Sequence, residues 1–145
     1  KPLQPAFSVY KGSAQNDISS EASVTVVFDS EIFDQNADFN TGTYTFTAPV
    51  TGKYLISLYL RLGSVDTDSA YIQPNINTSN RDFYITLDPN FSADLNYLSI
   101  GSTVLADMDA NDTCIARVFQ SGGTNNLTDI HHNEGQSMFQ GHLVC

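Results

Sequence analysis

The fold is indicated most clearly by residues 43–62, which read TYTFTAPVTGKYLISLYLRL. In the second half of this stretch, Tyr54, Ile56, Leu58, Leu60 and Leu62 alternate with Leu55, Ser57, Tyr59 and Arg61. Successive side chains of a strand point to opposite faces, so this period of two predicts a long β-strand with one dry face. The Pro and Gly of residues 49–52 predict a turn before it.

Shorter runs with the same alternation occur at residues 22–28, 43–48, 83–87 and 114–119. Turn residues separate them, at 40–42, 49–52, 88–90, 109–112 and 121–123. Regular short strands joined by turns predict an all-β, antiparallel sandwich or barrel, here one domain over residues 1–145. The expected core includes Phe7, Phe28, Phe46, Tyr54 and Phe139. We expect Gly42 and Gly52 at reversals that need backbone freedom.

The charge balance excludes several classes of partner. The chain has 16 acidic and 6 basic residues, a net charge of -10 and no cluster of Lys and Arg. Nucleic acid binding needs such a cluster, and an anionic membrane surface would repel this charge. No run approaches the roughly 20 apolar residues of a membrane-spanning helix. Neither nucleic acid binding nor membrane insertion is predicted.

The second face of the long strand predicts an interaction. Leu55 and Tyr59 lie there beside Ser57, where a solvent-facing strand would normally be polar. A strand that is apolar on both faces is covered either by another subunit or by a loop of its own chain. Leu55, Ser57 and Tyr59 are therefore the candidate subunit-interface residues.

Several segments, in this order, resemble the complement C1q globular-head family, part of the wider tumour-necrosis-factor-like jelly-roll superfamily. The most distinctive segment is residues 44–54, an aromatic-containing strand followed by a Pro-x-x-Gly-x-Tyr turn. The others are residues 5–10, 27–29, 39–42, 102–105, 109–112 and 138–144, the last with a closing Phe-x-Gly-x-Leu pattern. The chain departs from the family in lacking Trp and in having Asn111-Asp112 where Gly-Asp is usual.

The resemblance implies an antiparallel jelly-roll β-sandwich of the C1q/tumour-necrosis-factor-like type that assembles as a trimer. It gives the Leu55 and Tyr59 face a partner, the neighbouring subunit. It implies a secreted or extracellular location, which includes a microbial or virion surface, and no enzyme activity. The residues agree with the last point, because His131, His132 and His142 lie in no recognisable catalytic motif.

Two loops are the candidate ligand contacts, because binding loops on a rigid β scaffold are common. Asp66 and Asp68 lie in the first loop. The second loop contains Asp129, His131, His132 and Glu134, and its adjacent histidines can bind Zn²⁺ or change charge near pH 6.

A third segment is a candidate metal site. Asp107, Asp109 and Asp112 place hard oxygen ligands of the kind Ca²⁺ prefers within one turn. The alternative is a turn closed by its own Asp and Asn side chains, without metal. Calcium is the one candidate cofactor.

Two cysteines and four glycosylation sequons leave alternatives open. Cys114 lies on the apolar face of its strand and Cys145 ends the chain, so a disulfide across the core and a buried free thiol are both consistent. The sequons begin at Asn77, Asn90, Asn111 and Asn126.

The sequence therefore predicts an extracellular, homotrimeric ligand-recognition head. Its loops would bind a protein, a carbohydrate or another cell-surface ligand, and trimerisation would add avidity. The alternative is a structural trimerisation cap on a fibre, collagen-like rod, spore coat or virion appendage.

Overall fold

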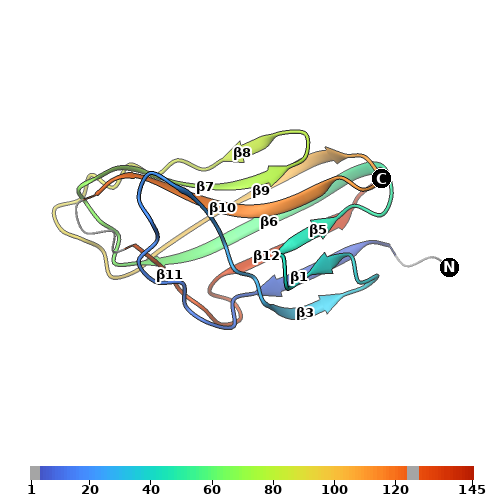
Figure 1. Cartoon of the computed structure of the whole chain (residues 1–145), viewed down its shortest axis with the longest axis horizontal. Helices are drawn as coiled ribbons and strands as arrows, with labels where there is room; N and C mark the ends of the chain where they lie inside the picture. Colours follow the sequence, from blue (N-terminus) through green and yellow to red (C-terminus); the bar gives the residue numbers. More distant parts are fainter. Residues whose placement is uncertain (1–3, 124–127) are drawn as a thin grey trace.

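Two antiparallel β-sheets pack face to face and enclose the core (Figure 1). The computed structural model describes residues 4–123 and 128–145, and these residues contain strands and turns but no helix. Sheet A consists of β1 (Ala6–Tyr10), β3 (Ser30–Asp34), β6 (Gly52–Gly63), β9 (Leu98–Met108), β11 (Asp129–Ile130) and β12 (Met138–Leu143). Sheet B consists of β2 (Ser23–Thr25), β4 (Phe39–Asn40), β5 (Thr45–Thr47), β7 (Ser69–Thr78), β8 (Asp82–Tyr84) and β10 (Thr113–Gly122).

The long strand predicted from residues 54–62 is β6, an interior strand of sheet A that lies between the edge strand β9 and β12. It pairs with β9 along its length and with β12 and β11 in succession. Its predicted dry face is buried at Tyr54, Ile56, Leu58, Leu60 and Leu62. The predicted antiparallel sandwich is confirmed.

Three predicted strands are shorter than their sequence patterns. Residues 43–48 keep only β5, Thr45–Thr47, and the run at 83–87 gives only β8, Asp82–Tyr84. Within residues 22–28 only Ser23–Thr25 forms a strand, although Val26 and Phe28 are buried as expected. The side chain of Gln15 contacts the backbone beyond this point, donating to the Thr25 carbonyl and accepting from the Val27 N–H. Side-chain hydrogen bonds thus replace part of the ladder, which alternation alone does not predict.

Phenylalanine rings fill the core, as the sequence predicted. Phe7 stacks on Phe46 with ring centres 4.6 Å apart, and Phe139 packs at 5.3 Å from Phe7 and 5.6 Å from Phe28. All four are almost fully buried. Their large apolar area supplies much of the burial that stabilises the sandwich.

Gly42 and Gly52 were expected at reversals that need the backbone freedom of glycine. That expectation is wrong, because neither residue has a positive φ. At Gly52 the requirement is close packing. A Cβ there would lie 2.5 Å from Leu143 Cδ1 and 2.6 Å from the Cys145 carbonyl oxygen.

Candidate functional site

The outer face of sheet A carries side chains in register across β9, β6, β12 and β1. Directly opposed residues of neighbouring strands project to the same side of a sheet. The rows are Leu105, Leu55, His142 and Ala6; Thr103, Ser57, Gln140 and Ser8; and Gly101, Tyr59, Met138 and Tyr10. We call these three rows the sheet A face.

The sheet A face contains no Asp, Glu, Lys or Arg, although the chain has 16 acidic residues; the next rows of the same outer face carry Lys53 and Asp107 at one end and Arg61 at the other. Leu105 is 58% exposed and Tyr59 41% exposed. A shallow hollow of about 530 Å³ lies along the face, bordered by Leu55, His142 and Phe33. Depletion of charge around exposed apolar groups is the composition of an interface core.

The predicted interface residues Leu55, Ser57 and Tyr59 all lie on this face. The exposure of Tyr59 shows that, within the described residues, no loop of the chain covers it. The sequence did not indicate Leu105 as an interface residue, although it is the more exposed of the two leucines in its row. Its position beside Leu55 depends on the β6–β9 register, which the sequence does not state.

The two predicted ligand loops lie together at one end of the sandwich. β11 pairs with the end of β6, so Asp129 lies opposite Gly63. The Asp129 carboxylate accepts hydrogen bonds from the Asp17 N–H at 2.9 Å and the Ser64 hydroxyl at 3.3 Å. Asp129 therefore holds neighbouring segments in place.

Asp66 differs from the expectation of an exposed contact. It is 2% exposed, and its Oδ1 accepts from the Asp68 N–H at 2.9 Å. Its Oδ2 is buried and has no hydrogen-bond partner. A direct ligand contact by Asp66 is not supported, whereas Asp68 remains exposed at the surface of the same turn.

The histidine loop contributes one ring stack. His131 lies 5.4 Å from Tyr97 between ring centres, and the Arg61 guanidinium lies 4.3 Å from the centre of the Tyr97 ring. His132 is half-buried, and Glu134 is exposed. The exposed groups of the predicted loops are thus Asp68 and Glu134, whereas Asp129, His131 and His132 are half-buried.

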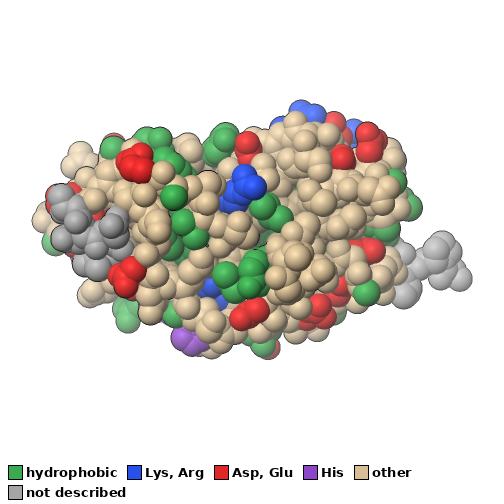
Figure 2. Space-filling model, in the orientation of Figure 1, with side chains coloured by type: hydrophobic (Ala, Val, Ile, Leu, Met, Phe, Trp, Pro, Cys, Tyr) green, Lys and Arg blue, Asp and Glu red, His purple; other side chains and the backbone are tan. Residues whose placement is uncertain are grey.

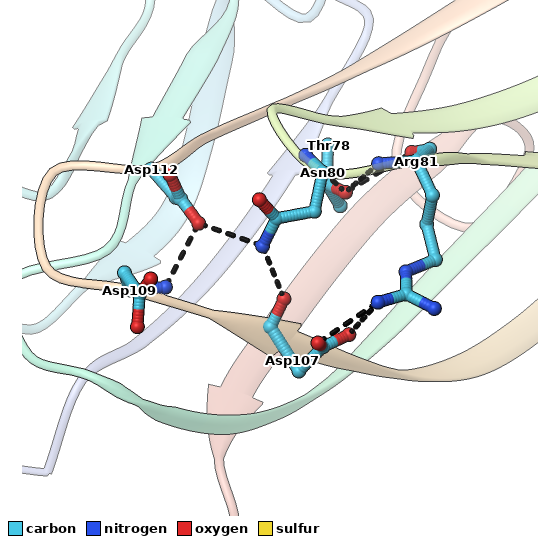
Figure 3. A network of polar contacts seen from close by, with 6 residues as sticks. All are labelled: Thr78, Asn80, Arg81, Asp107, Asp109 and Asp112. Carbon is cyan, nitrogen blue, oxygen red and sulfur yellow. Dashed lines mark hydrogen bonds and ion pairs between the residues drawn. The ribbon is translucent and has the colours of Figure 1, made fainter.

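In the predicted calcium turn, the carboxylates of Asp107 and Asp112 have partners within the protein (Figure 3). Asp107 forms an ion pair with Arg81 at 2.8 Å. Asp112 Oδ2 accepts from the Asp109 N–H at 2.8 Å and from Asn80 Nδ2 at 2.9 Å. Among the described residues, no group of three or more His, Cys, Asp or Glu side chains could hold a metal ion. The geometry favours the alternative of a turn closed by its own side chains.

The cysteines are free thiols in the structure, Cys114 buried and Cys145 exposed. No disulfide joins them, so the alternative of a buried free thiol describes Cys114. Burial raises the pKa of the Cys114 thiol far above its ordinary value, which makes the thiol unreactive.

Three sequons can be placed. Asn90 and Asn111 are exposed, whereas Asn77 is half-buried and donates to Asp82 at 2.6 Å. Asn126 lies outside the described residues.

One buried charge was not anticipated. Lys11 is fully buried, and its Nζ donates to the Gln15 side chain and to the Val27 carbonyl, both at 3.1 Å. Burial lowers the pKa of Lys11 to about 8, partly offset by the negative charge of Asp29. No alternation or motif around residue 11 signals this burial.

Comparison with solved structures defines the fold class. The globular domain of zebrafish complement 1qA superimposes with a TM-score of 0.70 at 17% identity, covering 99% of this chain and 98% of that one. Two crystal structures of murine APRIL, at pH 8.5 and 8.0, give TM-scores of 0.66 and 0.67 at 10% and 9% identity, each covering 98% of this chain and 100% of the other. The fold is the jelly roll shared by C1q and tumour-necrosis-factor-like domains, as predicted.

The family model of the C1q domain matches residues 6–144. The chain therefore belongs to the C1q domain family. No protein of established function matches it in a direct sequence comparison. Domains of this family are typically trimeric and extracellular, take part in ligand recognition and are generally non-enzymatic. The described part of the chain has no helix able to span a membrane.

Proposed function

We propose that the chain is the homotrimeric ligand-recognition head of an extracellular protein, assembled through the sheet A face. The observation that carries the proposal is the absence of charged side chains from that face. Acidic residues are more than a tenth of the chain, yet none occupies the three rows across four strands. A neighbouring copy of the chain is the occupant that fits, because trimeric assembly is typical of the family; in a threefold trimer the sheet A face of one copy packs on a different surface of the next.

Trimerisation through sheet A would leave two surfaces for ligands. One is the end of the sandwich with Asp68, His131 and Glu134; the other is the outer face of sheet B. A trimer presents three copies of each, so a weak single-site affinity for a protein, glycan or cell-surface ligand gains avidity.

Substitution of Leu105 tests the assembly. Its side chain is 58% exposed in one chain, so Leu105→Asp is expected to leave the fold of the single chain intact. In a trimer the substitution would bury a carboxylate, so sedimentation velocity should show monomers. Tyr84→Asp is the matched control, because Tyr84 is equally exposed on the opposite sheet and should leave the trimer unchanged. A trimer that survives Leu105→Asp would reject the sheet A face as the interface.

A further inference from the structure

A shallow groove crosses the outer face of sheet B, on the side opposite the sheet A face. It has a volume of about 390 Å³ and is lined by residues of β2, β7, β8 and β10. This is within the size range of small-molecule sites. Figure 2 shows this side of the molecule, on which Lys and Arg side chains are few.

Strand register places three polar groups in one row across the groove. Asn75 on β7 lies directly opposite Arg117 on β10 and directly opposite Tyr84 on β8. Opposed residues of adjacent strands have Cβ atoms about 5 Å apart. The sheet thus fixes the backbone positions from which the guanidinium, the amide and the phenol project, without a loop that must be ordered first.

Two of these groups have unused hydrogen-bonding capacity. Arg117 forms no hydrogen bond or ion pair with the described part of the chain, although acidic residues outnumber basic ones. By contrast, Arg81 is paired with Asp107. Asn75 is 7% exposed, and its Oδ1 is buried without a partner, while its Nδ2 donates to Asp82 at 3.2 Å. The Arg117 guanidinium is therefore positioned to bind a polar ligand, whereas the buried Asn75 Oδ1 would reach one only after its side chain moved.

Aromatic rings supply the apolar part of the groove. Tyr71 and Phe119 lie with ring centres 6.0 Å apart, and Tyr84 is 58% exposed. A hydrogen bond with the Asp82 carboxylate, the largest cause, raises the pKa of Tyr84 above its ordinary value of 10. Ring faces carry partial negative charge and attract weakly positive C–H groups.

We infer that this groove binds a neutral saccharide. A sugar ring has one face of C–H groups, which suits the aromatic rings, and a rim of hydroxyls that both donate and accept. Arg117 would donate to these hydroxyls, and the Asp82 carboxylate, whose Oδ1 already accepts from Asn75 and Asn77, would accept from them through its other oxygen. A neutral sugar fits better than an acidic one, because Asp82 balances Arg117 within the groove and the whole chain carries a charge of -10.

This inference deepens the recognition part of the proposed function and rests on it, but it does not require the trimer. The test is an NMR titration of ¹⁵N-labelled protein with the methyl glycosides of glucose, galactose, mannose and N-acetylglucosamine. At least one should shift the amide signals of β7, β8 and β10 around Asn75, Tyr84 and Arg117. A methyl glycoside of glucuronic acid should bind more weakly than its neutral counterpart.

Three variants decide whether the groove is the site that binds the glycoside. Tyr84→Ala and Arg117→Met should each weaken binding at least about tenfold. Tyr97→Ala is the matched control, because Tyr97 is similarly exposed but lies outside the groove, and it should retain the affinity. Thermal melts establish that each variant is folded. Shifts located elsewhere, no shifts with any glycoside, or affinity unchanged by both groove variants would overturn the inference. Sedimentation of the same samples tests assembly separately, so a trimer that binds no sugar rejects the groove alone.

Discussion

Leu55 on β6 lies directly opposite Leu105 on β9, and both side chains face away from the core. In the isolated chain this pair meets solvent, with Leu105 58% exposed. Uncharged groups continue from the pair across the neighbouring rows, and Lys53 and Asp107 border it on the other side. An uncharged patch with a charged border, holding an exposed leucine pair, is best explained as the interior of an assembly that the single chain does not complete.

If the sheet A face is buried between copies, the melting temperature should depend on protein concentration. Folding and association are then linked, so a higher concentration favours the folded trimer. We expect the melting temperature of the wild type to rise over a hundredfold increase in concentration, and that of Leu105→Asp to stay constant. Differential scanning calorimetry measures both. If the melting temperature of the wild type did not change with concentration, folding would not need association.

Gly141 is expected to resist even the smallest substitution. A Cβ at this position would lie 2.6 Å from Ile56 Cδ1 and 2.9 Å from Phe7 Cε1. Gly141→Ala should therefore lower the free energy of unfolding by about 1–3 kcal/mol, measured by urea denaturation. Ile56→Val removes the nearest clashing atom, so the double variant should lose less than the sum of the two single losses. Simple additivity would contradict this packing explanation.

Asn111 occupies the left-handed region, with φ 76°. Asn tolerates this region better than most residues, and Gly adopts it freely. Asn111→Ala should therefore destabilise the domain by about 1 kcal/mol, whereas Asn111→Gly should be neutral or stabilising. Urea midpoints of the two variants provide the comparison. Equal losses for Ala and Gly would instead assign the role to the Asn side chain.

Lys11 should make stability rise with pH in the alkaline range. Its pKa is about 8 in the folded chain and 10.5 without burial, so between these values the unfolded chain binds more protons. Stability therefore increases as pH rises from about 8 towards 10. Burial raises the pKa of Tyr54 above its ordinary value of 10, which opposes this trend only at higher pH.

The slope is measured by urea denaturation between about pH 8 and 10, and Lys11→Met should flatten it. The comparison uses only the change in free energy of unfolding per pH unit, so the variant and the wild type can differ in their absolute stability. An unchanged slope in Lys11→Met would mean that another group is responsible.

The sequence predicted the features that depend on local pattern. Alternation identified β6 and β10, because each strand has one face against the core, and ordered motifs identified the family. The sequence did not predict the groupings of residues that depend on the register between strands. Leu105 joins Leu55, and Arg117 joins Asn75 and Tyr84, only because of how distant strands pair.

Burial of single polar groups was equally hidden. Asp66 was expected at the surface but is enclosed, and its Oδ2 would meet a Cβ at Gly123 at 2.7 Å. Lys11 is buried against the Val27 carbonyl, which follows from chain packing and not from its neighbours in sequence. In both cases residues outside the local sequence help to enclose the group: Gly123 and Thr128 beside Asp66, and Val27 beside Lys11.

The most direct test of assembly through the sheet A face is the mass of the domain in solution, measured by multi-angle light scattering in the presence of EDTA. We predict three times the 15.9 kDa of one chain, without any need for calcium. A mass of 15.9 kDa that persists at high concentration would contradict the proposed trimer, and the sheet A face would then require a different partner.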